Sequence, residues 1–150
     1  MIARPDLEME AQRKDKNNGA SGGLSHSGGR WTLHLYREAG PKDRPTILLL
    51  HGLPSSSRMF QPLLTKLADS YHLVAPDYPG YGHSDWPDPK QFTYTFDNIA
   101  SVMDEFTEAL GLSRFTLYMQ DYGGPIGFRI AMAQAGASAG SDRPGCGRSQ

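Results

Sequence analysis

The sequence lacks several features that would place it in a specialised class of protein. Of its 150 residues only Cys146 is a cysteine, which excludes an internal disulfide and a cysteine-rich metal site. Lysine and arginine (15) nearly balance aspartate and glutamate (16), so no excess charge favours nucleic acid or an anionic membrane. The longest aliphatic run, Ile47–Leu50, falls far short of the ~20 residues of a membrane helix, and the charged N-terminus lacks a signal-peptide core. We therefore expect a cytoplasmic protein without metal or cofactor.

The two ends of the chain differ in composition from its middle. Residues 1–29 are polar and contain too little apolar surface to offset their ordering entropy. Residues 134–150 contain no large apolar side chain and cannot supply a core strand. We expect a disordered leader over 1–29, a folded domain over 30–133, and a disordered or aberrant tail over 134–150. The abrupt change at this tail is typical of a longer fold that has been cut short.

Between the ends, patterns typical of strands alternate with patterns typical of helices. Continuous or alternating apolar runs predict strands over Trp31–Tyr36, Thr46–Leu50, His72–Pro76 and Arg114–Gln120. Apolar residues three or four positions apart predict helices near 59–68 and over Phe96–Leu110, the second of which Gly111 ends. This alternation predicts an α/β fold with a mainly parallel sheet.

The stretch YMQDYGGPIG places Asp121 at a turn between a predicted strand and a predicted helix. A nucleophile on such a sharp turn, called an elbow, stands clear of the sheet at the carboxyl ends of the strands. Gly123 is the small residue two positions after the nucleophile, and Gly124 and Gly127 are expected to keep the start of the helix slim against the sheet. A carboxylate is already ionised at neutral pH and can displace a leaving group at a saturated carbon. For Asp121 taken alone, N-capping of the helix is the alternative interpretation.

A second motif, His51-Gly52-Leu53-Pro54, directly follows the predicted strand Thr46–Leu50. A turn at a strand end can aim the Leu53 amide into the cleft, where it would form an oxyanion pocket together with the Tyr122 amide. We interpret His51 as a residue that stabilises the turn rather than as a base, because bases of this fold come late in the chain.

Taken together, these motifs resemble the first half of the α/β-hydrolase fold. LLLHGLPSSSRMF, VAPDYPGYGHSD and YMQDYGGPIGFRIA occur in that order, and residues 31–133 are most similar to the epoxide hydrolase and haloalkane dehalogenase branch. The resemblance implies Asp121 as nucleophile, the Leu53 and Tyr122 amides as oxyanion donors, a cis Leu53–Pro54 bond and a small-molecule substrate. It also implies that later strands and a cap domain are missing from this sequence.

The resemblance leaves two chemistries open. Dehalogenases of this branch hold the departing halide with indole or amide N–H groups. One donor follows the nucleophile, where Tyr122 stands here, and the other lies either at the position of Leu53 or in the cap. A phenol and a side chain without any donor stand there instead, so the sequence favours the opening of an epoxide or a related apolar compound over dehalogenation. Trp86 lies near the predicted cleft mouth, where it is either a substrate contact or a loop anchor.

A non-catalytic chain is the alternative from another class of function. In this fold the order along the chain is nucleophile, acid, histidine. All five histidines precede Asp121, and the single carboxylate after it, Asp142, belongs to the tail. The letters His83-Ser84-Asp85 are sequence neighbours and cannot adopt triad geometry. We therefore expect this chain to lack the base and the acid that complete turnover, and to be inactive in multiple turnover.

Overall fold

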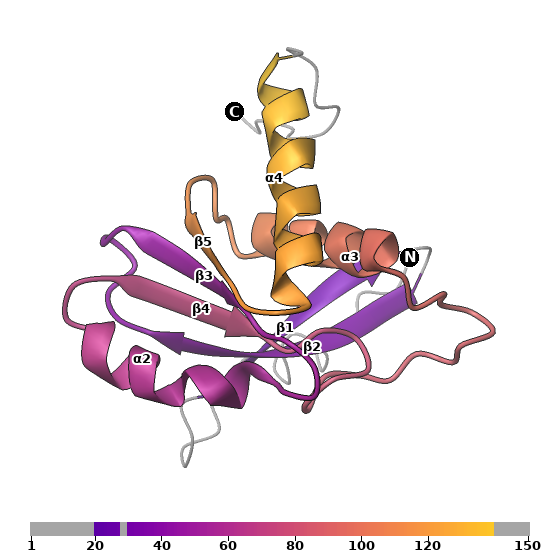
Figure 1. The fold of residues 1–150 in the computed structure, drawn as a ribbon, viewed down its shortest axis with the longest axis horizontal. Helices are drawn as coiled ribbons and strands as arrows, with labels where there is room; N and C mark the ends of the chain where they lie inside the picture. Colours follow the sequence, from indigo (N-terminus) through magenta and orange to yellow (C-terminus); the bar gives the residue numbers. More distant parts are fainter. Residues whose placement is uncertain (1–19, 28–29, 140–150) are drawn as a thin grey trace, which may run out of the picture.

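The computed structural model describes residues 20–27 and 30–139, which form one sheet with helices on both faces (Figure 1). The strands are β1 (Ala20–Ser27), β2 (Arg30–Ala39), β3 (Thr46–Leu50), β4 (His72–Pro76) and β5 (Thr116–Met119). The helices are the short 3-10 helix η1 (Ser57–Phe60) and the α-helices α2 (Gln61–Leu67), α3 (Phe96–Ala109) and α4 (Gly123–Ala139). The strands and helices predicted between residues 31 and 133 are therefore present, and the α/β class is confirmed.

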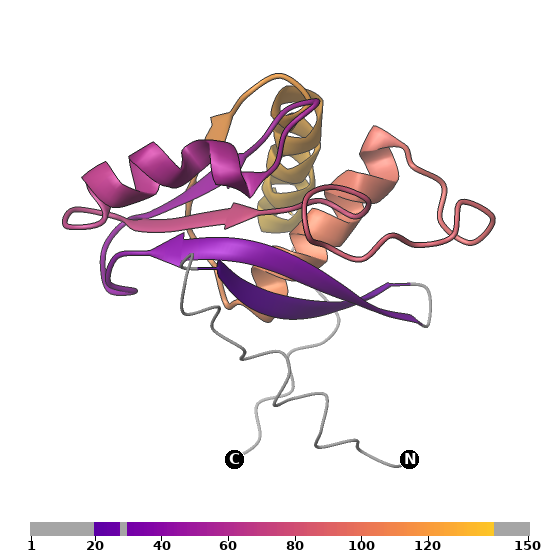
Figure 2. The ribbon, with the colours of Figure 1, turned by 90° about the horizontal axis from the view of Figure 1, so that it is seen from below.

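The sheet is mixed, with the strand order β1-β2-β4-β3-β5. β3 runs parallel to β4 and β5, whereas β2 is antiparallel to both β4 and β1. Figure 2 shows the long β1–β2 hairpin twisting along one side of the sheet. The parallel part, β4-β3-β5, is the part whose carboxyl ends carry the predicted motifs.

Burial on both faces explains the continuous apolar run of β3. Leu48 and Leu50 face one side of the sheet, where they pack in a core with residues of α3 and α4. Leu49 faces the other side and packs with Phe60 and Leu64, which η1 and α2 provide. Because successive side chains of a strand point to opposite faces, a strand covered on both faces needs apolar residues at every position.

Helix α3 follows the predicted pattern closely. The side chain of Thr95 caps its N-terminus by accepting a hydrogen bond from the Asn98 amide at 3.2 Å. Its apolar stripe is buried against the sheet, and this stripe includes Ile99, Val102, Met103 and Phe106. Gly111 adopts a left-handed backbone directly after the helix, with a φ of 69°. The helix therefore covers the same face of the sheet as α4, and the two helices share one core with β3.

Both ends of the described chain differ from the sequence-based expectation. β1 lies inside the predicted leader and pairs with β2 from Ala20↔Arg37 to Ser27↔Arg30. The backbone N–H and C=O groups form the hydrogen bonds of this pairing. A glycine- and serine-rich segment has the same backbone groups as any other, so it can form a strand without apolar side chains. α4 continues to Ala139, past the predicted domain end at residue 133, because alanine favours the helix. The rest of the predicted leader and tail lies outside the described residues.

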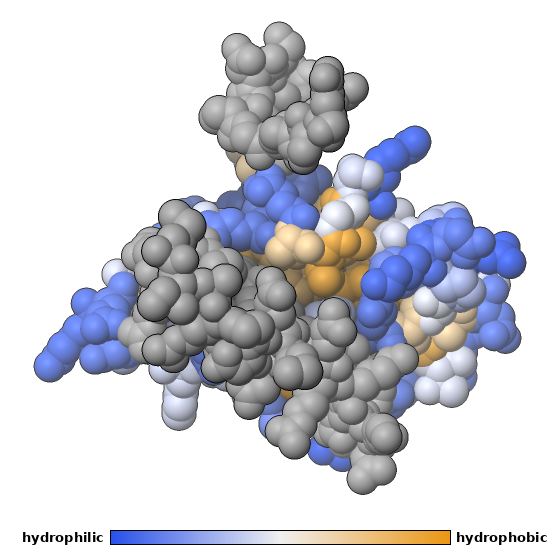
Figure 3. Space-filling view, turned by 180° about the vertical axis from the view of Figure 1, so that it is seen from behind, coloured by the Kyte–Doolittle hydropathy of each residue, from blue (hydrophilic) through white to orange (hydrophobic). Residues whose placement is uncertain are grey.

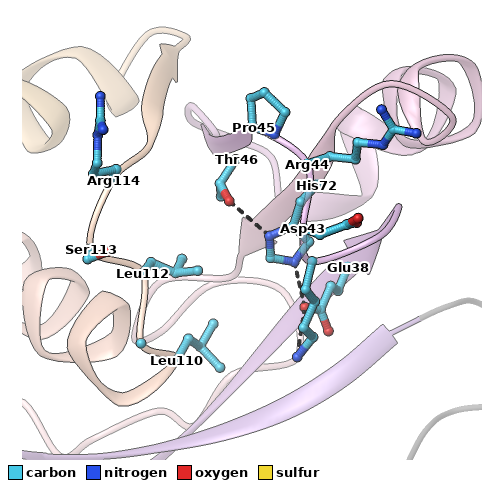
Figure 4. Close-up of a pocket in the computed structure, with 12 residues that line it drawn as sticks. Glu38, Asp43, Arg44, Pro45, Thr46, His72, Leu110, Leu112, Ser113 and Arg114 are labelled. Carbon is cyan, nitrogen blue, oxygen red and sulfur yellow. Dashed lines mark hydrogen bonds and ion pairs between the residues drawn. The ribbon is translucent and has the colours of Figure 1, made fainter.

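A polar cluster closes the end of the sheet opposite to Asp121 (Figure 4). Thr46 and His72 are the first residues of β3 and β4. Nε2 of the buried His72 lies 2.7 Å from Oε1 of Glu38 on β2, and Nδ1 lies 3.0 Å from Oγ1 of Thr46. His72 thus links three neighbouring strands. At the rim of the adjacent cavity the guanidinium groups of Arg44 and Arg114 point away from His72, so no set of cations converges there.

Some apolar surface remains uncovered in the part of the chain that the structure describes. β5 pairs there with β3 alone, and Tyr118 on this edge is half exposed. α4 rises away from the sheet (Figure 1), and Phe128 and Met132 on it are largely exposed. Seen from behind, hydrophobic residues gather near the middle of the molecule, with hydrophilic residues toward both sides (Figure 3). No helix in the described ranges is both long and apolar enough to cross a membrane.

Candidate active site

Asp121 stands at the predicted strand–turn–helix. β5 ends at Met119 and α4 begins at Gly123, and Asp121 between them adopts a left-handed backbone with a φ of 51°. The Gly123 N–H donates to the Gln120 carbonyl at 2.9 Å, and the Gly124 N–H donates to the Asp121 carbonyl at 2.8 Å. A non-glycine residue in this conformation costs about 1–3 kcal/mol and is often found at functional sites. The turn therefore presents the carboxylate beyond the carboxyl end of the sheet.

The second motif meets this carboxylate, as the sequence predicted. The Leu53 N–H donates to Oδ2 of Asp121 at 2.8 Å, across 68 positions of sequence, and the Leu53–Pro54 bond is cis. Gly52 is needed for this approach, because an added Cβ would lie 2.6 Å from the Asp121 Cβ and 2.8 Å from its Oδ2. Sequence reasoning assigned Gly52 to the turn but missed this contact, for which no pattern within a single segment gives a signal.

His51 supports the turn from beneath. Its ring is fully buried and stacks on Tyr78 at a centroid distance of 4.0 Å. Nδ1 lies 2.9 Å from the Gly52 carbonyl, and Nε2 accepts a hydrogen bond from the Tyr78 N–H at 3.5 Å. The Tyr78 hydroxyl in turn donates to the His51 carbonyl at 2.8 Å. Burial lowers the pKa of His51, against smaller opposing effects of the Gly52 carbonyl and of Asp77, so the ring is held neutral with its proton on Nδ1.

This arrangement predicts a loss of stability in mild acid. The unfolded imidazole titrates near 6.5, and the folded pKa is lower. Below about pH 6.5 the unfolded chain therefore binds a proton that the folded chain does not, and stability falls by at most about 1.4 kcal/mol per pH unit until the folded pKa is passed. Urea unfolding between pH 7.5 and 5 measures this slope. In His51→Gln we expect lower stability at neutral pH but a flatter profile, whereas equal slopes in the two proteins would contradict the assignment.

Asp77, directly after β4, ties the loops around the turn together. Oδ1 accepts from the Ser57 N–H at 2.6 Å, and Oδ2 accepts from the His83 N–H at 3.0 Å. The Ser84 hydroxyl donates to the Asp77 carbonyl at 2.7 Å and accepts from the Leu35 N–H at 2.9 Å. The letters His83-Ser84-Asp85 are thus loop and not a triad.

Other predicted site residues have distinct surroundings. The ring of Tyr122 packs edge-on against Phe96 at 5.1 Å, and its backbone N–H has no hydrogen-bond acceptor among the described residues, so its role as second oxyanion donor stays a prediction. A Cβ added at Gly123 would overlap the Leu50 carbonyl, as expected for a helix held close to the sheet. Gly124 differs from its expected role, because a Cβ there would meet nothing within 4 Å. Trp86 lines a cavity that also contains the side chain of Leu53.

The fold and these motifs agree with the comparisons to known proteins. A family model of the alpha/beta hydrolase fold matches residues 45–135. The chain belongs to the α/β-hydrolase fold family. Among solved structures, a loop variant of a haloalkane dehalogenase from Bradyrhizobium elkanii superposes with a TM-score of 0.68 at 32% identity, over 78% of this chain and 37% of that one.

Two curated relatives of this α/β-hydrolase chain are named as a hydrolase and as a dehalogenase. An uncharacterized hydrolase of Saccharomyces cerevisiae is 43% identical over 97 residues, which are 65% of this chain and 33% of the relative. Haloalkane dehalogenase 2 of Mycobacterium tuberculosis is 42% identical over 91 residues, which are 61% of this chain and 31% of the relative. The chain thus spans about a third of the length of these relatives. The names support the dehalogenase alternative better than the epoxide hydrolase that the sequence favoured.

Proposed function

We propose that this chain carries the nucleophile of a dehalogenase-like hydrolase, in which Asp121 displaces halide from a small apolar haloalkane. The observation that carries the proposal is the hydrogen bond from the Leu53 amide to Oδ2 of Asp121 at 2.8 Å. It holds one carboxylate oxygen of the exposed Asp121, and no described residue forms a hydrogen bond to the other, Oδ1. The dehalogenase names among the relatives support a carbon–halogen bond as the target.

In the first step, an oxygen lone pair of Asp121 forms a bond to the carbon that carries the halogen. The carbon–halogen bond breaks, and the halide leaves with the bonding electron pair. The product is an alkyl ester of Asp121, and this step needs no base because the carboxylate is already ionised. The oxygen held by Leu53 becomes the ester carbonyl oxygen, so the same amide N–H is placed to stabilise the oxyanion that forms when water attacks.

Hydrolysis of this ester needs a base that activates water. Within the described residues no histidine hydrogen-bonds to Asp121, and all five histidines of the sequence precede it. His51 is buried and both of its ring nitrogens are in contact with backbone groups. We therefore propose that the ester accumulates on this chain and that turnover stops after one event, since the loss of a general base slows a step by about 10²- to 10⁴-fold.

Epoxide opening is the second candidate, and the residues beside Asp121 favour it. Leu53 has no side-chain donor and Tyr122 offers a phenol in place of an indole, so neither supplies the N–H groups with which dehalogenases of this branch hold the halide. An epoxide would be opened by the same attack. The carbon–oxygen bond would break, and the resulting alkoxide would take a proton from solvent water. The ester would then retain every atom of the epoxide.

Mass spectrometry of the intact protein distinguishes these candidates. The protein is incubated with 1-bromohexane or with styrene oxide, in a Cys146→Ser background because the sole thiol is a competing nucleophile. Alkylation by the bromide adds a hexyl group and releases bromide, whereas epoxide opening adds the whole epoxide. We expect one adduct per chain with the bromide, located by peptide mapping on the peptide that contains Asp121.

The matched control is Asp121→Asn, which keeps the shape of the side chain and removes the ionised oxygen. We expect the adduct to disappear in this variant. An adduct of equal yield in Asp121→Asn would overturn the nucleophile assignment. Adduct formation with styrene oxide alone would favour the second candidate, and sustained release of bromide over many turnovers would contradict the proposed missing base.

A further inference from the structure

An apolar cavity opens beside the Leu53 turn. Its volume is about 690 Å³, within the ~300–1,000 Å³ that is typical of small-molecule sites. Its walls come from the turn after β3 and from the long loop between β4 and α3, and they consist of Leu53, Gly80, Tyr81, Trp86, Pro87, Pro89 and Tyr94. No lysine, arginine, aspartate or glutamate lines it.

Gly80 and Tyr94 hold their part of the cavity wall in a defined position. Gly80 has a φ of 80°, and a Cβ added there would lie 2.8 Å from both the Trp86 Nε1 and the Tyr94 ring, so the two aromatic rings converge on a backbone that only glycine permits. The Tyr94 hydroxyl donates to the Pro87 carbonyl at 2.7 Å. The Tyr94 ring also packs edge-on against Phe92 at 4.9 Å. The loop is thus tied to itself around the cavity.

Trp86 is the unusual member of this wall. Its side chain is 83% exposed, although an indole is among the side chains that gain most from burial. No ring contact or hydrogen bond holds it among the described residues, and its indole N–H has no acceptor there. A large aromatic side chain left open beside an apolar cavity is typical of a ligand-binding wall.

Leu53 connects the cavity to the chemistry. Its backbone N–H binds the Asp121 carboxylate at 2.8 Å, and its side chain, 47% exposed, forms part of the cavity wall. Leu53 is therefore the residue that the cavity wall shares with the contact to the nucleophile. Burial is the main cause that raises the pKa of Tyr81 in the cavity wall, so its phenol stays protonated at neutral pH.

We propose that this cavity binds the hydrocarbon part of the substrate, with Trp86 as its outer wall, and that it selects alkyl or aromatic compounds without charge. That the bound compound is a substrate rests on the proposed function. The binding preference itself rests on the cavity. Charged compounds of the same size are excluded because none of the lining residues can neutralise a buried charge.

Toluene, which Asp121 cannot alkylate, is the probe for binding. In the ¹⁵N–¹H spectrum of the full chain the two tryptophans give two indole signals, and Trp86→Phe assigns them. We expect toluene to shift the Trp86 signal to saturation and to leave the other indole unchanged. Benzoate, which adds a carboxylate to the same ring, should bind at least tenfold more weakly. Trp86→Ala should weaken toluene binding by about tenfold. Because this variant lacks the indole signal, its binding is measured from the resonances of the Leu53 methyl groups.

The matched control is Phe128→Ala, which removes an exposed aromatic ring outside the cavity. It should leave toluene binding unchanged. A second readout is the rate of ester formation on Asp121 with 1-bromohexane relative to bromoethane, whose short chain hardly enters the cavity. We expect this ratio to fall about tenfold in Trp86→Ala and to stay the same in Phe128→Ala.

The outcomes separate the two proposals. Toluene that saturates the Trp86 signal equally in wild type and Asp121→Asn supports the cavity, even if no ester forms and the proposed function fails. Toluene that leaves the Trp86 signal unchanged, or benzoate that binds as tightly as toluene, overturns the inference even if the ester forms. An unchanged bromohexane-to-bromoethane ratio in Trp86→Ala would overturn the role of Trp86 in selecting substrate.

Discussion

Replacing Asp77 by alanine is expected to lower the free energy of unfolding by about 2–6 kcal/mol. The carboxylate is buried and accepts the N–H groups of Ser57 at 2.6 Å and of His83 at 3.0 Å. Each buried donor left without a partner costs about 1–3 kcal/mol. Since Ser57 begins η1, directly after the Leu53 turn, we also expect the Asp121 adduct to form more slowly. Urea unfolding followed by circular dichroism measures the loss.

The control for Asp77→Ala is Asp69→Ala, which removes an exposed carboxylate without a hydrogen bond or ion pair in the described residues. This variant should stay within about 0.5 kcal/mol of wild type. Asp77→Asn keeps one acceptor oxygen but directs an amide group at the second donor, so it should be destabilised nearly as much as alanine. A change below about 1 kcal/mol in Asp77→Ala would show that the loop can rearrange to satisfy both amides.

Replacing Gly123 by alanine is expected to abolish the Asp121 adduct and to destabilise the fold by about 1–3 kcal/mol. The new Cβ would overlap the Leu50 carbonyl oxygen and lie 2.8 Å from its carbonyl carbon. Both are backbone atoms of the central strand β3, which cannot give way as a flexible side chain can. α4 and the Asp121 turn must therefore move away from β3, and Asp121 loses the Leu53 amide.

The neighbouring Gly124 offers a matched control. A Cβ at Gly124 meets nothing within 4 Å, although the position lies in the same helical turn. We expect Gly124→Ala to retain the adduct and to gain up to about 1 kcal/mol, because alanine has the higher helix propensity. The comparison uses the adduct yield from mass spectrometry and the midpoint of urea unfolding. Equal behaviour of the two variants would contradict the close approach of α4 to β3.

The sequence was sufficient where a local pattern coincides with burial. Thr46–Leu50 is apolar at every position because both faces of β3 are covered, and the structure has the predicted bounds. In α3 the apolar residues recur every three or four positions because only one face of the helix is buried. The site motifs were recognisable because a sharp turn admits few residue types. Their meeting in space followed from the rule that parallel strands share their carboxyl ends.

Other features leave no trace in a local pattern. β1 is held by backbone pairing in a glycine- and serine-rich segment, so its side chains gave no periodic signal. The contact of Gly52 with Asp121 and the convergence of Trp86 and Tyr94 at Gly80 join segments that are distant in sequence or folded back within a loop. The sequence also could not decide between haloalkanes and epoxides as substrates. Its preference for epoxides rested on two absent N–H donors, at Leu53 and Tyr122, and not on a group that is present.

The hydrogen bond between Leu53 and Asp121 has a consequence for the order in which the chain folds. Its partners are 68 positions apart, and β3 must pair with β4 and with β5, both of which come later in the chain. Contacts at such separation form slowly, because the loop entropy is lost before the contact forms. α3 and the β1–β2 hairpin are local and can form early. The nucleophile therefore reaches its amide partner only at the end of folding, and its reactivity reports on the completely assembled sheet.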